Sequence, residues 1–172
     1  MTAAQALDLA GEMLQEPKIL ERTEDDPVLL GLLDAVISEI CAEYFPLRTS
    51  EEAESGGEIP LSSLAKRFRQ LFSAEIGGKR VACALLPFSL RTPAGKVKLE
   101  YAYLPAPLQE ESEQLELSPE VDLRTVALGV AAEYSLRQSL YEQALAFDRK
   151  FRESLAALAP RRAGSLPARR FV

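Results

Sequence analysis

Apolar residues recur at helical spacing in two stretches near the start of the chain. In residues 3–15 they lie three and four positions apart, and Thr2 stands where an N-cap side chain accepts a backbone hydrogen bond. A second apolar stripe covers residues 27–45. It follows Asp26-Pro27, which places a capping aspartate before a first-turn proline. The sequence therefore predicts helices over 3–15 and 27–45.

The next stretch loses this periodicity. Residues 49–58 are acidic, small and glycine-containing, so we expect a mobile surface loop there. From Ile59 onward the period changes to two, which is typical of β-strands. The sequence predicts a small antiparallel sheet inserted at about 59–104.

Alternation predicts three strands within this insertion, over 67–74, 79–86 and 96–104. Gly77-Gly78 is a hairpin signal between the first two. In the first strand one face is expected to carry Phe68, Gln70, Phe72 and Ala74. The last strand has the clearest pattern, with one face formed by Val97, Leu99, Tyr101 and Tyr103.

Helical spacing returns after a proline- and glutamate-rich connection at 105–117. Ser118-Pro119 has the composition of a helix start, and the pattern predicts a helix over 119–137 whose small residues allow a neighbouring helix to approach closely. The pattern weakens at Gln138-Ser139 and resumes over 140–158. The last helix has an apolar stripe of Tyr141, Ala144, Leu145, Phe151, Leu155 and Leu158.

The predicted fold class is α+β, mainly α. Short links favour an antiparallel bundle of about four helices, with a small antiparallel β-sheet or hairpin inserted and an extended C-terminal arm. We expect residues 1–159 to form a single domain. Residues 160–172 have no periodicity and are expected to be extended or disordered when alone.

The composition is that of an ordinary soluble protein. Of the 172 residues, 47% are apolar and 27% charged, and there is no histidine. Cys41 and Cys83 both fall in apolar patterns and are expected to be small core residues. Because no apolar run is long enough for a membrane span and no secretory signal is visible, we expect a protein made in a cytosol without membrane contact.

Charge is distributed unevenly along the chain. The net charge is −6, but residues 160–172 carry four arginines and no acidic residue, which leaves 16 basic and 26 acidic side chains in residues 1–159. A body with a net charge of −10 should be repelled by nucleic-acid backbones.

The candidates for chemistry are weak. Glu39, Glu43 and the acidic loop lack the ligand pattern of a calcium site, so a solvated face is favoured. Asp148 is expected in a helix-to-helix salt bridge or a subunit contact rather than in acid–base catalysis. No nucleophile, base and orienting group can be assembled from this sequence. We therefore expect no enzyme activity, no cofactor and no catalytic or metal-ligating residue.

The arginine-rich tail has three interpretations: a solubilising end, a weak nucleic-acid contact, or an arm that binds a protein partner. Phe171 and Val172 favour the arm, because a purely electrostatic tail gains nothing from them. The predicted partner-binding residues are Arg161, Arg162, Arg169, Arg170, Phe171 and Val172.

The chain resembles head–tail connector (adaptor) proteins of tailed bacteriophages and prophages over about two-thirds of its length. A strand ending in Tyr-x-Tyr-x-Pro, a loop, a helix of small residues around Ala-x-Glu-Tyr and a second helix beginning Tyr-Glu are shared. The segments that carry the resemblance are 98–105, 117–121, 127–134 and 141–155, with further similarity at 40–47 and 168–172.

This resemblance implies a structural protein of the virion neck, made in the host cytoplasm. Such proteins form a homo-oligomeric ring between the portal and the tail, through which DNA passes without sequence-specific binding. By the same resemblance, the arm docks onto the portal or a neighbouring subunit. Two alternatives stay open: another neck or tail-completion protein, and a nucleic-acid-binding regulator that uses the arginine tail.

Overall fold

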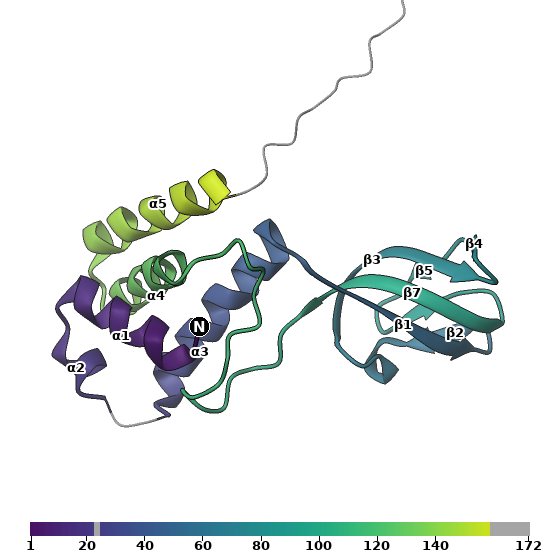
Figure 1. The fold of residues 1–172 in the computed structure, drawn as a ribbon, viewed down its shortest axis with the longest axis horizontal. Coiled ribbons are helices and arrows are strands. Elements are labelled where there is room, and N and C mark those ends of the chain that lie inside the picture. The colour runs from purple at the N-terminus through teal and green to yellow at the C-terminus, as the bar shows by residue number, and fades with distance from the viewer. Residues whose placement is uncertain (23–24, 159–172) are drawn as a thin grey trace, which may run out of the picture.

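The computed structural model describes residues 1–22 and 25–158, which form a helical lobe and a sheet lobe (Figure 1). Helices of all types, five of them α-helices, account for 45% and strands for 26% of the described residues, with the strands in two antiparallel sheets. The fold is a mixed α+β fold. The prediction of a mainly helical four-helix bundle with a small inserted sheet is therefore wrong.

Local capping sets the beginnings of the first long helices. In α1 (Ala3–Leu14), Thr2 accepts a hydrogen bond from the backbone N–H of Gln5, whose side chain accepts one from the backbone N–H of Thr2. In α3 (Pro27–Glu39), Asp26 accepts a hydrogen bond of 2.8 Å from the N–H of Val28. Both predicted caps are confirmed.

Two features of this region differ from the prediction. A short helix, α2 (Pro17–Leu20), follows α1. The helix expected over 27–45 changes after Glu39 into a π-helical turn over Ile40–Tyr44.

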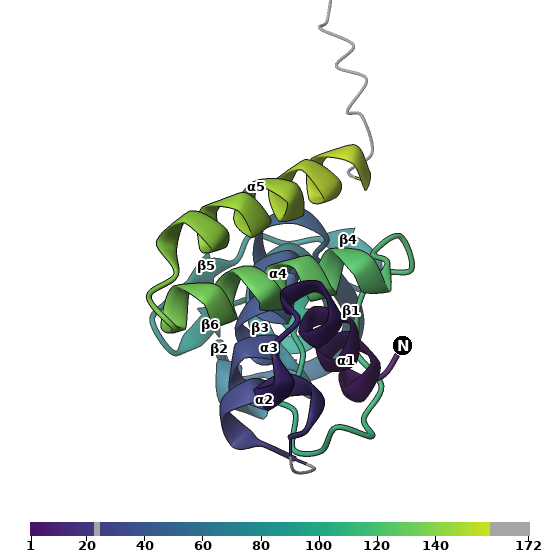
Figure 2. The ribbon, with the colours of Figure 1, turned by 90° about the vertical axis from the view of Figure 1, so that its left-hand side faces the viewer.

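Helix α4 (Leu123–Arg137) is the centre of the helical lobe and packs against α1, α3 and α5 (Tyr141–Leu158) (Figure 2). A Cβ atom on its Gly129 would lie 2.6 Å from Val36 Cγ1 and 3.0 Å from Phe151 Cε2. The close approach expected of its small residues is confirmed. The predicted start at Ser118-Pro119 is wrong, because Asp122 caps the helix by accepting a hydrogen bond of 2.7 Å from Thr125 N–H.

The larger sheet has the strand order β1-β7-β3-β4. The acidic stretch expected to be a loop lies mostly in β1 (Leu47–Ser55), whose nine residues all pair with β7 (Gly95–Leu104). The glutamates at 52 and 54 lie on the exposed face, whereas Ala53 packs against the sheet core. Pairing with a central strand therefore overrides the low strand propensity of this segment.

Two β-bulges change the face expected for β3 (Arg67–Ile76). The register with β7 shifts between Phe68 and Gln70 and again between Leu71 and Ser73, so Phe68, Leu71 and Ala74 lie opposite Tyr103, Tyr101 and Leu99. The prediction that Gln70 and Phe72 share a face with Phe68 and Ala74 is wrong, because each bulge adds a residue to β3. The Phe72 side chain instead lies beneath the guanidinium of Arg48, 4.1 Å from the ring centre.

The predicted strand over 79–86 is divided between two sheets. Its first part, β4 (Lys79–Arg80), pairs with β3. Its later part, β5 (Ala84–Leu85), belongs to a second sheet of order β2-β6-β5, with β2 at Glu58–Pro60 and β6 at Ser89–Arg91. A short 3₁₀ helix at Leu61–Ser63 follows β2.

Each lobe has its own apolar core, and Leu47 packs against both. Tyr101 is fully buried in the sheet core and Tyr103 is 8% exposed, so the face predicted for these tyrosines with Val97 and Leu99 is confirmed. Cys41 is buried, as expected, but Cys83 is only half-buried, because it lies at the margin of the sheet core.

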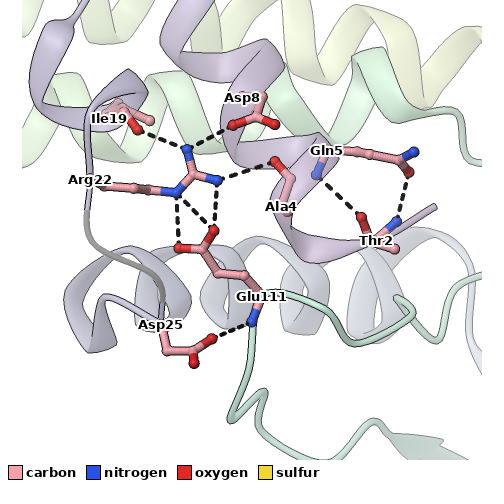
Figure 3. A network of polar contacts seen from close by, with 8 residues as sticks. All are labelled: Thr2, Ala4, Gln5, Asp8, Ile19, Arg22, Asp25 and Glu111. Carbon is pink, nitrogen blue, oxygen red and sulfur yellow. Dashed lines mark hydrogen bonds and ion pairs between the residues drawn. The ribbon is translucent and has the colours of Figure 1, made fainter.

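A buried ion pair fastens the connection after β7 to the helical lobe (Figure 3). Arg22 donates hydrogen bonds of 2.9 and 2.7 Å from Nε and Nη2 to the carboxylate of Glu111, and the two side chains are only 7% and 9% exposed. Arg22 also donates to Asp8 and to the carbonyl of Ile19, both at 2.8 Å. The Glu111 N–H in turn donates to Asp25. This network joins α1, the end of α2 and the connection between the lobes.

Candidate interaction surface

The tail residues predicted from the sequence to bind a partner lie outside the described residues. This applies to all six: Arg161, Arg162, Arg169, Arg170, Phe171 and Val172. Their role stays a prediction. The described part of the chain contributes a different surface, which the sequence analysis did not identify as a site.

Four large apolar side chains are exposed where α4 turns into α5. Leu136 is 50% exposed, Leu140 49%, Tyr141 63% and Leu145 69%. We call these four residues the hairpin patch. Clustered apolar side chains that remain in water are typical of surfaces that contact other proteins.

Sequence analysis placed Tyr141 and Leu145 in one stripe with Phe151 and Leu155. The structure separates them: Phe151 and Leu155 are buried against α3 and α4, while Tyr141 and Leu145 lie on the neighbouring, uncovered side of α5. The sequence signal for an exposed apolar surface was therefore the width of this six-residue stripe, because one helix face cannot bury all six side chains against α4.

The turn that carries the hairpin patch has a defined geometry. Ser139 has a φ of 62°. Its N–H donates a hydrogen bond to the carbonyl of Leu136, and the N–H of Leu140 donates one to the carbonyl of Ser135. These are the two hydrogen bonds of a Schellman motif, with serine in the left-handed position usually occupied by glycine. The break expected at Gln138-Ser139 is confirmed. The motif fixes the direction of α5 and so the position of the patch.

A shallow groove of about 360 Å³ runs beside the patch, between α4 and α5. Its apolar part is formed by Leu136, Tyr141 and Leu145 with two alanines, and its polar end by Glu133, Asp148 and Arg152. Arg152 donates a hydrogen bond of 3.0 Å to Asp148 and lies 3.4 Å from a carboxylate oxygen of Glu39 on α3. A salt bridge between helices was expected for Asp148, but its partner Arg152 lies one turn away on the same helix, and the bridge between helices is the one from Arg152 to Glu39.

The polar end of the groove is strongly acidic. Burial raises the pKa of Glu39; Arg152 counteracts the shift, and the nearby carboxylates of Glu43, Asp148 and Glu133 add to it. Three other carboxylates thus lie near that of Glu39, and Arg152 forms salt bridges with Glu39 and Asp148; we call the four acidic residues the acidic cluster. The side chains of Glu39 and Asp148 are 27% and 38% exposed, so the cluster remains open to a charged partner.

The sheet lobe also exposes apolar residues, at the turn between β5 and β6. Phe88 is 85% exposed and Leu85 59%. A second shallow groove lies beside them, lined in part by Leu61, Phe68 and Pro87. This surface lacks acidic neighbours among its lining residues, in contrast to the α4–α5 groove.

In residues 1–22 and 25–158, no three Cys, Asp or Glu side chains lie together in a geometry that could hold a metal ion. In the same residues, no helix combines the length and the apolar character that a membrane span requires.

Comparison with known proteins gives no assignment. No family model matches the chain, and none of the curated proteins matches it.

Proposed function

We propose that this protein is a structural subunit of a bacteriophage head–tail connector, which forms a ring with copies of itself between the portal and the tail. The observation that carries the proposal is the hairpin patch. Tyr141 and Leu145 belong to a segment whose sequence resembles connector proteins, 141–155; Leu140 directly precedes it, and Leu136 follows the segment 127–134 by two positions. A subunit that functions by assembly needs such an apolar surface, and the resemblance to connector proteins indicates that the assembly is a ring.

The charge of the protein supports the same proposal. Residues 1–159 carry a net charge of −10. A ring lined by acidic subunits repels the duplex, so DNA passes through the lumen without being held. The neck of the virion is then the site of action, with the portal and the tail or neck proteins as partners.

The test is assembly with the portal protein of the same phage or prophage. We expect the two proteins to co-purify and to give rings in negative-stain electron microscopy. We also expect an epitope tag on this chain to be labelled at the neck of intact particles. Failure to co-purify with the portal, or label anywhere other than the neck, would overturn the proposal.

A further inference from the structure

The α4–α5 groove has a chemical character that selects its occupant. One end is apolar and is formed by Leu136, Tyr141 and Leu145. The other end is lined by Glu133 and Asp148 of the acidic cluster together with Arg152. A segment that fits both ends must present a large apolar side chain next to positive charge. Contacts of this kind combine a desolvated anchor with charge-assisted hydrogen bonds to carboxylates.

The chain itself contains such a segment. Residues 159–172 contain four arginines and no acidic residue, and Arg169-Arg170 directly precedes Phe171. Neighbouring residues of an extended chain are about 3.3 Å apart. Leu145 and Asp148 are separated by three positions on a helix, or about 4.5 Å of rise. The spacing of charge and apolar side chain is therefore similar in the segment and in the groove.

The segment begins at the end of α5 that lies away from the groove. The groove lies along the first half of α5, whereas Leu158, from which the segment continues, lies at the opposite end of that helix, on the side nearer the sheet lobe (Figure 1). An 18-residue helix is about 27 Å long. Fourteen residues span at most about 50 Å, which is longer than α5 and long enough to reach a neighbouring copy.

We infer that residues 159–172 of one subunit bind in the α4–α5 groove of a second copy of this chain, with Phe171 against the hairpin patch and Arg169 and Arg170 on the acidic cluster. The inference rests on the proposed function in one respect, since a ring supplies the neighbouring copy. Each subunit then binds one neighbour through its own segment and binds the segment of another neighbour in its groove. This head-to-tail contact closes into a ring when the rotation between subunits allows it.

The test uses the full chain with p-benzoylphenylalanine in place of Phe171. Equal amounts of ¹⁴N and ¹⁵N protein are mixed, illuminated and digested, and the crosslinked peptides are identified by mass spectrometry. We expect crosslinks from position 171 to residues 132–148, and we expect mixed-isotope pairs among them, because segment and groove belong to different chains.

A pair of matched variants locates the contact. Leu145→Glu places a charge in the apolar part of the groove and should lower the crosslink yield about tenfold, as expected for loss of an anchoring contact. Leu85→Glu makes the same change at a comparably exposed leucine of the sheet lobe and should leave the yield unchanged. Thermal unfolding by circular dichroism shows that both variants are folded.

A charge exchange provides a second measurement that changes no core residue. Arg169→Glu with Arg170→Glu should weaken the crosslink, and adding Glu133→Arg on the groove should restore part of it. Crosslinks confined to same-isotope pairs would show that the segment occupies its own groove, and crosslinks elsewhere, or none, would show that it does not bind there. Each of these results overturns the inference. Co-purification with the portal is measured separately, so the connector proposal can survive their failure.

Discussion

Arg22 and Glu111 form an ion pair that is almost completely removed from water. Both carboxylate oxygens accept hydrogen bonds from Arg22, and the remaining donors of the guanidinium are directed at Asp8 and at backbone carbonyls. A buried pair of this kind adds little net stability compared with apolar residues, but removing one partner leaves the other charge buried and uncompensated.

We therefore expect Glu111→Ala to lower the free energy of unfolding by about 3–5 kcal/mol. Asp8→Ala is the matched control, because Asp8 contacts the same guanidinium while its side chain is 56% exposed. Its cost should be at most about 1 kcal/mol. Urea denaturation of the two variants measures the difference. Equal, small effects would show that solvent reaches the Arg22 site.

The two cysteines also differ in how far their side chains are buried. Burial and the charge of Glu116 raise the pKa of Cys41 to about 11, and its side chain is 1% exposed, whereas Cys83 is half-buried at the edge of the sheet core. The thiolate is the reactive form. At pH 8 a soluble aromatic disulfide should modify Cys83 in the folded protein and Cys41 only after unfolding. In Cys83→Ser the fast reaction should disappear; its persistence would contradict the burial of Cys41.

At the scale of elements, the helical lobe depends on the close packing of α4. The missing side chain of Gly129 lets Val36 and Phe151 approach the α4 backbone from two sides. Gly31 in α3 is also a helical glycine, but no atom lies within 4 Å of a Cβ placed there. The two positions therefore separate the effect of space from that of helix propensity.

Gly129→Ala should destabilise the protein by about 1–3 kcal/mol, because the new methyl group overlaps side chains that are themselves packed. Gly31→Ala should stabilise it by about 0.5–1 kcal/mol, because alanine loses less backbone entropy in a helix. Thermal unfolding of both variants gives the two signs. Stabilisation by both substitutions would mean that α3, α4 and α5 are less closely packed than described.

Elements whose signals are local were predictable from the sequence. The caps at Thr2 and Asp26 and the break at Ser139 depend on residues within a few positions of one another. Strand β1 was not predictable in this way, because its glutamate-rich sequence becomes a strand only through pairing with β7, about 50 positions away. The bulges in β3 shift its inward face for the same reason.

The candidate surface was predictable only in part. Tyr141 and Leu145 were recognised as apolar helix positions, but which side of α5 remains uncovered depends on where α4 ends and how α5 crosses it. The acidic cluster is still less local, since Glu39, Glu133 and Asp148 belong to three different helices. No periodicity in the sequence brings these three carboxylates together.

At the scale of the whole molecule, Glu116 links the two lobes. It lies in the connection before α4, next to two leucines that pack against the helical core, at positions 115 and 117. Its carboxylate accepts hydrogen bonds from Tyr103 Oη at 2.7 Å and from Lys66 Nζ at 3.0 Å, both in the sheet lobe. Lys66 also lies 5.1 Å from the centre of the Tyr103 ring.

These contacts shift the pKa values of both partners in opposite directions. Burial and the hydrogen bond to Glu116 raise the pKa of Tyr103 to about 12. Burial favours the protonated form of Glu116, but the hydrogen bonds from Tyr103 and Lys66 outweigh it and hold the pKa of this carboxyl below its usual value of 4.5. The folded protein therefore binds a proton at Glu116 less readily than the unfolded chain does.

It follows that Glu116 stabilises the folded protein fully above about pH 4.5, and that this contribution is lost as the pH falls through the lower, folded-state pKa. Glu116→Gln should lower the stability at pH 7 by about 1 kcal/mol or less, since Lys66 and Glu116 remain 44% and 39% exposed. The difference from the parent protein should vanish in acid.

Glu39→Gln is the control with the opposite sign. Because burial raises the pKa of Glu39, ionisation of this carboxyl lowers the stability of the folded protein as the pH rises above 4.5. The stability of the glutamine variant relative to the parent should therefore increase over the same pH range. Urea denaturation at a series of pH values measures both variants. Parallel pH profiles for the two would show that the carboxyl of Glu116 is not held by the sheet lobe, and that the lobes are joined there by the chain alone.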